Sequence, residues 1–374
     1  MIFRIYAMVK KEFRQIMRDA RTLYLIFIFP VFLLILFGYA LSLDVKNVTI
    51  AVKNNDNSEE SRDFVEMLQS SSYFKVVGYI HTHAEVNKYL DEKLAQCVVV
   101  FPPGFAADMQ SGKNVQLQFL VDGVDGNTAT VIINYVTSAT RFYNNKITQE
   151  FLARNGMKGF VPIDPQPLFW YNPDLNTTKF LIPGLLCMIL ITTAVILTCL
   201  SIVREKELGS MEQLRVSPLG SFEMIIGKTI PYTVVALFVA AFTLLISNIA
   251  FGMEVRGSYI WLFVTTVIFL IATLSLGIFI STISDSQQVA FQIASVATML
   301  PTFILSGFIF PIESMPWPVQ ILTNITPAKF FIIILRSIML KGAGIEAFWK
   351  QIGSLLIFAA FFLGISTLRM RKTK

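Results

Sequence analysis

The chain has 374 residues, of which 54% are hydrophobic and 15% are charged, whereas a soluble domain usually carries about 25% charged residues. This composition excludes an ordinary soluble enzyme, and three cysteines are too few for a disulfide scaffold or a cysteine-rich metal module. The net charge of +6 is compatible with a nucleic-acid partner. Many basic residues lie beside long apolar runs, however, and this favours a lipid membrane and no nucleic acid.

Residues 1–21 are predicted to form an amphipathic helix on the inner membrane leaflet. Apolar side chains recur at steps of three and four residues, and basic side chains occupy the other face. The apolar set is Ile2, Tyr6, Val9, Phe13 and Ile16, and the basic set is Lys10, Lys11, Arg14 and Arg18. A simpler interpretation, compatible with the first, is a basic segment that only sets the membrane topology.

Six apolar runs are each long enough to cross a membrane, which takes about 20 helical residues. Their apolar cores, such as Phe180 to Val203 and Thr229 to Phe251, contain no Asp, Glu, Lys, Arg or His. A carrier driven by its own titrating residue is therefore disfavoured. The predicted spans are residues 22–43, 179–203, 223–251, 258–283, 288–310 and 350–368.

Basic residues gather before the first span and in the tail at residues 369–374, so both termini are predicted to be cytoplasmic. The first span has an alternative interpretation as a signal peptide, because Ala40-Leu41-Ser42 has the form of a cleavage site. Its apolar stretch is longer than the roughly 7 to 15 residues of a signal-peptide core, which favours a retained span.

Residues 44–178 are predicted to form an extracytoplasmic α/β domain inserted between the first two helices, because strand-like and helix-like segments alternate there. His81 and His83 have no obvious third ligand, so no metal site is expected. Asp122 and Asp125 each precede a glycine and are interpreted as turn residues rather than as paired catalytic carboxylates.

The segment at residues 204–222 follows the second predicted span and falls in the cytoplasm. It reads R-E-K-E-L-G-S-M-E-Q-L-R-V-S-P-L-G from Arg204 to Gly220, and by composition alone it is compatible with a solvated loop. Gly227-Lys228-Thr229 is not a phosphate loop, because it lies too far from Gly220 and runs directly into a membrane span. No bound nucleotide or other cofactor is therefore predicted on this chain.

Residues 311–345 contain an apolar stretch that is short for a span and includes Lys329 and Arg336. They are predicted to form an extracytoplasmic re-entrant or interfacial hairpin. The alternative, a seventh span, would place the basic C-terminal tail outside. The hairpin residues singled out are Phe308, Phe310, Pro311, Pro316, Trp317, Pro327 and Arg336.

Several of these segments resemble one family. E-K-E-x-G-S/T-x-E-Q-L-x-V-S/T-P closely resembles the loop after the second membrane helix of ABC-2 type permeases, the membrane subunits of ATP-binding cassette exporters. L-S-G-F-I-F-P-I-E-S-M-P-W-P, N-I-T-P-A-K-F and L-R-S-I-M-L-K-G resemble the family's segment before its last span. F-P-P-G-F-A and V-D-G-V-D-G-N-T-A are similar to the large-domain branch related to drug-efflux permeases.

The resemblance implies a type V exporter half with six transmembrane helices, a surface elbow helix and a coupling helix that docks on a separate cassette ATPase, which binds ATP and Mg. It also implies a homodimer or a heterodimer with a similar permease, a periplasmic adaptor as a further candidate partner, and the bacterial inner membrane. The coupling element would comprise Arg204, Glu205, Lys206, Glu207, Gly209, Ser210, Met211, Glu212, Gln213, Leu214, Arg215 and Pro218.

The expected activity is therefore export of an amphipathic or lipid-like compound, since the predicted membrane interior is rich in aromatic residues and poor in charge. Two other classes of function remain open at this point. One is a secondary carrier or channel, which would work without an ATPase. The other is a mechanotransmission subunit, in which ATP hydrolysis moves the outer domain without transport.

Overall fold

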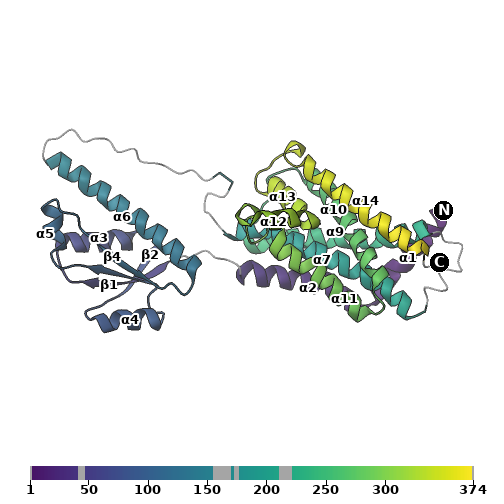
Figure 1. Ribbon diagram of the computed structural model, residues 1–374, viewed down its shortest axis with the longest axis horizontal. Coiled ribbons are helices and arrows are strands. Elements are labelled where there is room, and N and C mark those ends of the chain that lie inside the picture. The colour runs from purple at the N-terminus through teal and green to yellow at the C-terminus, as the bar shows by residue number, and fades with distance from the viewer. Residues whose placement is uncertain (1, 41–46, 155–169, 172–176, 210–220, 373–374) are drawn as a thin grey trace. The chain divides into compact units, whose positions relative to one another are not determined.

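The computed structural model describes residues 2–40, 47–154, 170–171, 177–209 and 221–372 (Figure 1). The chain divides into two compact units. A helical unit comprises Met1–Ser42 and Leu168–Lys374, and a second unit comprises Leu43–Pro167. In the sequence, the second unit is thus an insertion between the first two long helices of the helical unit.

The helical unit contains six described helices that are long and apolar enough to cross a membrane. Helices α1, α12 and α13 are not among these six, whereas α2 is. The helices are α1 (Ile2–Arg18), α2 (Ala20–Ala40), α7 (Thr177–Glu207), α9 (Ser221–Phe251), α10 (Tyr259–Ile283), α11 (Gln287–Leu305), α12 (Trp317–Leu322), α13 (Pro327–Met339) and α14 (Trp349–Lys372).

Helix α7 forms the centre of the helical unit. Of its apolar stretch 94% is buried, compared with 61% for α10 and less than 30% for each of the other four candidate spans. The helices α2, α9, α10, α11 and α13 all pack against it. A helix that is apolar on every side must be surrounded by other helices or by lipid, and α7 is surrounded by the protein.

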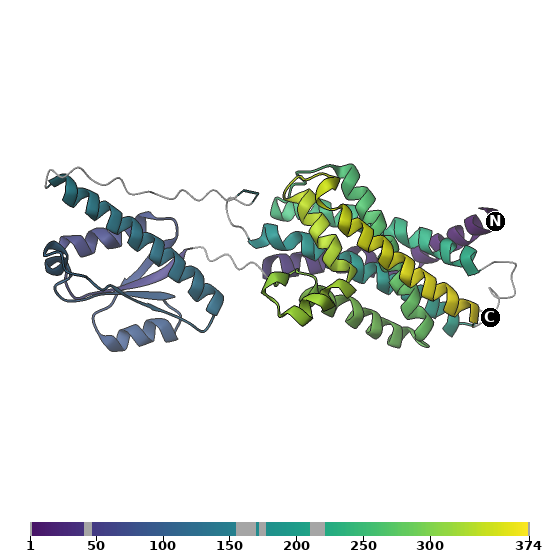
Figure 2. The ribbon, with the colours of Figure 1, turned by 45° about the horizontal axis from the view of Figure 1, so that its top comes forward.

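Both ends of the chain lie at one end of the helical unit. Figures 1 and 2 show α1 and the C-terminal end of α14 there, close to the end of α7 and the start of α9. We call this the basal end. The short helices α12 and α13 lie toward the opposite end, where α2 ends and α7 begins.

Three of the long helices are followed by a glycine with positive φ, and two of them, α7 and α11, end away from the predicted positions. Helix α7 continues to Glu207 rather than stopping at residue 203, and Gly209 follows it with φ +69°. Helix α11 ends at Leu305 rather than at residue 310, and Gly307 follows it with φ +76°. Glycine is favoured just past a helix end because it tolerates the left-handed conformation needed there.

The second unit is a small sheet covered by helices on both faces. Its strands are β1 (Val48–Asn54), β2 (Phe74–Tyr79), β3 (Cys97–Phe101) and β4 (Gln118–Val121), in the order β2-β1-β3-β4. Strand β1 is parallel to β2 and β3, whereas β4 is antiparallel to β3. The helices are α3 (Glu59–Ser70), α4 (His83–Asp91), α5 (Phe105–Gln110) and α6 (Gly126–Arg154).

Two apolar cores hold this unit together. Phe64 of α3 and Ile132 of α6 pack with Val99 on one face of the sheet, whereas Val86 of α4 packs with Val98 on the other. The alternation of strand and helix expected for this segment is therefore present in the fold.

Candidate functional site

Three charged side chains from three helices meet at the basal end. Glu12 of α1, Glu205 of α7 and Lys228 of α9 are all buried, with at most 2% of each residue exposed. Lys228 Nζ lies 3.1 Å from Glu12 Oε1 and 2.8 Å from Glu205 Oε2. We call these three residues the basal ion cluster.

Neighbouring polar groups complete the basal ion cluster. Lys11 Nζ donates to Glu205 Oε1 and lies 3.6 Å from Glu12 Oε1, so two ammonium groups balance two carboxylates. Tyr232 donates its hydroxyl hydrogen to Glu12 Oε2 over 3.1 Å, and Lys228 donates to Ser201 Oγ over 3.2 Å. A buried charge costs several kcal/mol unless it is paired and hydrogen-bonded, so these contacts fix α1, α7 and α9 to one another.

The basal ion cluster corrects one expectation from the sequence. The charge-free apolar core of the third predicted span, residues 223–251, was taken to begin at Thr229, and no buried charge was expected beside it. In the structure the candidate span is Ile226–Phe251 and Lys228 is buried within it. The helical interior is therefore not free of charge at the basal end, because pairing between helices permits burial that no single apolar run reveals.

The first four residues of the predicted coupling element form the last turn of α7 rather than a loop. Arg204 makes an ion pair with Asp19, at the junction of α1 and α2. Lys206 Nζ donates to the carbonyl oxygens of Ser281 and Ser284, at the end of α10.

Glu207 completes these contacts by accepting hydrogen bonds from Gln287 at the start of α11, including one from the backbone N–H over 2.7 Å. The last turn of α7 is thus fastened to the α1–α2 junction, α10 and α11, in addition to α9 through Glu205. The remaining predicted coupling residues, except Gly209, lie outside the described residues; they are Ser210, Met211, Glu212, Gln213, Leu214, Arg215 and Pro218.

The predicted exit hairpin is a bent pair of short helical segments. Trp317–Ile325 and Pro327–Met339 meet at an angle of 88°, and Pro327 is the first residue of α13. Helix α13 has 13 residues, which at about 1.5 Å per residue gives roughly 20 Å, less than the approximately 30 Å of a hydrocarbon core. Neither segment alone can therefore cross a membrane.

Arg336 connects α13 to the ends of two spans. Its Nη1 donates to Gly307 O over 2.9 Å and its Nη2 to Phe308 O over 3.1 Å. The guanidinium carbon also lies 3.8 Å from the ring centroid of Phe180, near the start of α7. Phe308 is fully buried against Gly184. Of the other hairpin residues singled out, Pro327 is buried and Phe310, Pro311, Pro316 and Trp317 are exposed.

Sequence analysis did not single out Glu12, Asp19 or Tyr232. Glu12 had a usable signal, because it is the lone acid in α1. It lies four residues from both Met8 and Ile16, which are buried. An acid on an apolar helix face needs a partner, and the partner here is a lysine 216 residues away along the chain.

The helical unit, with six candidate spans of which one is almost completely buried, has the architecture of a multi-pass membrane protein. A family model described as ABC-2 family transporter protein matches residues 20–368. The chain therefore belongs to the ABC-2 family of transporter proteins, and the prediction of a polytopic α-helical membrane protein is confirmed.

Similar proteins occur in bacteria and in a eukaryote. The probable multidrug ABC transporter permease YbhR of Escherichia coli (strain K12) is 32% identical over 361 residues, which are 96% of either chain. The probable multidrug ABC transporter permease YbhS of the same strain is 31% identical over 99% of this chain and 97% of its own length. ABC transporter G family member 20 of Dictyostelium discoideum is 25% identical over 99% of this chain but 52% of its own length.

Replacing Lys228 by methionine should strongly destabilise the helical unit. Lys228→Met keeps most of the side-chain length but leaves two buried carboxylates with one ammonium partner, and breaking a buried pair typically costs about 3–5 kcal/mol. The apparent Tm of the purified protein in detergent, followed by size-exclusion chromatography after heating, should fall well below that of the wild type.

A second variant, in which one acid is removed together with the lysine, tests whether the lower Tm comes from an unbalanced buried charge or only from the loss of the lysine side chain. The double variant Lys228→Met/Glu205→Gln should regain most of the lost Tm, because Lys11 and Glu12 remain balanced. Lys10→Met is the control, because Lys10 is exposed on α1 next to Lys11; this variant should leave the Tm unchanged. A double variant no more stable than Lys228→Met would contradict the role assigned to the cluster.

The close packing of Phe308 on Gly184, toward the other end of α7, can be tested by adding a methyl group at Gly184. A Cβ at Gly184 would lie 2.0 Å from Phe308 Cδ2, so Gly184→Ala should displace the ring and cost about 1–3 kcal/mol. Gly364→Ala in α14 is the matched control, because a Cβ there meets no atom within 4 Å and alanine favours helices. The apparent Tm should fall for Gly184→Ala only; equal values for the two variants would argue against this close approach.

Proposed function

We propose that this chain is the membrane-spanning permease subunit of an ABC exporter and that residues 204–222 couple it to a separate cassette ATPase. The observation that carries the proposal is the attachment of the last turn of α7 to α1, α9, α10 and α11, immediately before the segment that resembles the family's coupling loop. The transported compound would be amphipathic or lipid-like, as in drug efflux. The relatives named as probable multidrug permeases support this assignment.

The contacts of α7 suggest how movement of the ATPase would reach the membrane. A force on the segment after Glu207 would act on a helix end that is fixed to four neighbouring elements by charged side chains. Because α7 is also the central helix, a shift at its basal end would change the packing of the whole unit. ATP binding would then favour one arrangement of the helices over another through its different affinity for the two.

The same proposal includes a topology. Both termini and the basal end would face the cytoplasm of a bacterial cell, because basic residues flank the first and last spans. The sheet-containing unit and the α12–α13 hairpin would then lie on the extracytoplasmic side of the inner membrane. Six candidate spans would supply half of a pathway, so a homodimer or a heterodimer with a similar permease is expected, with a periplasmic adaptor as a further partner.

A secondary carrier is the strongest competing function, because the basal ion cluster places titratable groups inside the helical unit. Two features favour a structural role for these groups. Each acid is paired with a lysine, and Glu12 also accepts a hydrogen bond from Tyr232. The cluster moreover lies at one end of α7, whereas carriers place such groups along the substrate path. A mechanotransmission subunit is less favoured, since it usually has fewer spans.

Substitution in the coupling segment tests the proposal. Glu212→Lys should reduce co-purification with the partner cassette ATPase, because loss of one member of a buried interfacial charge pair costs about 2–5 kcal/mol. The permease-stimulated ATP hydrolysis should fall in parallel. The wild-type chain alone should neither bind nor hydrolyse ATP, since ATP and Mg would reside on the partner.

Glu254→Lys provides the control, because Glu254 is an exposed acid in the connection between α9 and α10. At matched membrane expression, this variant should keep wild-type co-purification and hydrolysis. Wild-type values for Glu212→Lys would contradict the coupling role of the segment. Hydrolysis of ATP by the chain alone would contradict the division of labour between the two subunits.

A further inference from the structure

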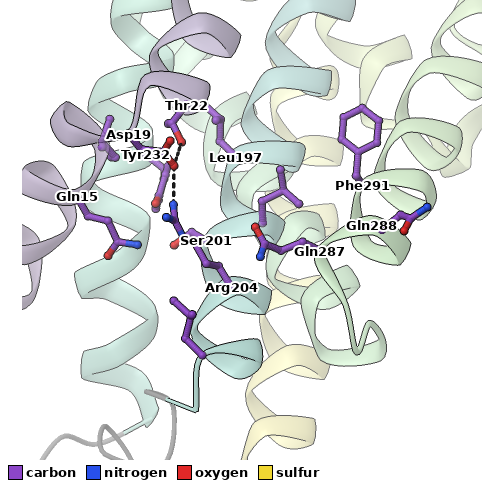
Figure 3. A pocket seen from close by; sticks show the side chains of 13 residues that line it. Gln15, Asp19, Thr22, Leu197, Ser201, Arg204, Tyr232, Gln287, Gln288 and Phe291 are labelled. Atoms are coloured by element: carbon purple, nitrogen blue, oxygen red, sulfur yellow. Dashed lines mark hydrogen bonds and ion pairs between the residues drawn. The ribbon is translucent and has the colours of Figure 1, made fainter.

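Two adjoining cavities open beside the basal ion cluster. The larger, of about 620 Å³, is bounded by residues of α1, α2, α7, α9 and α11 and by Asp19 (Figure 3). The smaller, of about 500 Å³, lies along α1. Gln15, Asp19 and Arg204 line both cavities, so the two are neighbouring parts of one site.

The smaller cavity is strongly basic. Its lining consists of Lys11, Arg14, Gln15, Arg18, Asp19 and Arg204. The first four of these recur at steps of three and four residues and therefore share one face of α1.

Two of the four cations in the smaller cavity are already paired, Lys11 with Glu205 and Arg204 with Asp19. Arg14 and Arg18 are exposed and form no ion pair with any other residue in the described ranges. The cavity therefore carries a positive excess on two guanidinium groups. These groups present planar pairs of donors, which match the oxygen atoms of a phosphate.

The larger cavity adds apolar surface to this basic one. Ile16, Leu197 and Phe291 contribute hydrocarbon or aromatic groups, and Thr22 and Gln287 contribute polar ones. Figure 3 shows Gln15 and Asp19 on one side of the cavity and Phe291 on the other. A ligand with an anionic head and an apolar tail would match the two cavities together, whereas a small inorganic anion would occupy only the smaller, basic cavity.

The faces of α1 indicate that this ligand comes from the membrane. Met8, Glu12 and Ile16 face the protein, whereas Phe3, Tyr6 and Met17 are 89%, 62% and 67% exposed. An exposed apolar face beside a basic face is typical of a helix that lies at the boundary between headgroups and acyl chains. The basic cavity is then at the level of the phosphates of the adjacent leaflet.

We propose that the two cavities together bind an anionic membrane lipid, with its phosphate at Arg14 and Arg18 and part of an acyl chain beside Leu197 and Phe291. The site goes beyond the proposed coupling function, since it lies on described residues of α1, α7 and α11 and does not require an ATPase. The bound lipid would link the surface helix to the last turns of α7.

Lipid binding to the full chain, purified in detergent, tests the proposal by native mass spectrometry. Dioleoyl phosphatidylglycerol should bind at least several-fold more tightly than dioleoyl phosphatidylcholine. Arg14→Gln/Arg18→Gln should weaken phosphatidylglycerol binding by roughly tenfold or more, as expected for two cations near an anionic headgroup. Lys10→Gln, an exposed cation of the same helix outside the cavity, should change it by less than about twofold.

Two further arms distinguish a lipid from a soluble anion. Inorganic phosphate should not displace phosphatidylglycerol at comparable concentration, and Phe291→Ala should weaken binding of the dioleoyl lipid more than that of its dihexanoyl counterpart. Displacement by phosphate would overturn the lipid assignment in favour of a free-anion site. A loss of binding free energy for Lys10→Gln of half that of the double arginine variant, or more, would overturn the site itself, because binding would then follow net charge alone.

Discussion

Lys228 lies between two buried carboxylates, and burial of any one of these charges is costly unless it is paired with its partners. Because the three charges come from α1, α7 and α9, the positions of these helices depend on one another. Serine and tyrosine hydroxyls complete the hydrogen bonding. The basal end of the helical unit is therefore fixed by directional contacts, whereas most of the remaining packing is apolar and non-directional.

Helix α7 is held by specific contacts at both of its ends. At its basal end, charged side chains attach it to α1 and to three other candidate spans, α9, α10 and α11. Toward its start, the guanidinium of Arg336 lies over Phe180, and Phe308 packs on Gly184. The predicted coupling segment and the α12–α13 hairpin are thus connected by one buried helix that is held at both ends, which is the arrangement expected if events at one end are to affect the other.

Hydropathy and the positions of basic residues were sufficient to predict six candidate spans, the N-terminal helix α1 and the short helix α13. Hydropathy failed at the ends of helices, where Gly209 and Gly307 set the boundaries through their backbone conformation. It also failed at Lys228, because hydropathy gives no sign that a charge beside an apolar run is buried unless its partners are known. Those partners, Glu12 and Glu205, are distant in the sequence, so only the fold brings them together.

The predicted coupling residues also show that the sequence alone does not reveal which charged residues are buried. Their sequence was recognised through a family resemblance, and the structure assigns the first four of them to a helix end in which Glu205 is buried rather than available to another subunit. The proposed docking on an ATPase would therefore depend on the residues that follow Gly209 rather than on Glu205.

A photo-crosslinking amino acid at Met211 tests this account most directly. In membranes that contain the partner cassette ATPase, illumination should join the chain covalently to the ATPase, whereas the same amino acid at Glu254 should give no such product. No adduct from Met211, or equal adducts from the two positions, would contradict the claim that this segment couples the permease to the ATPase.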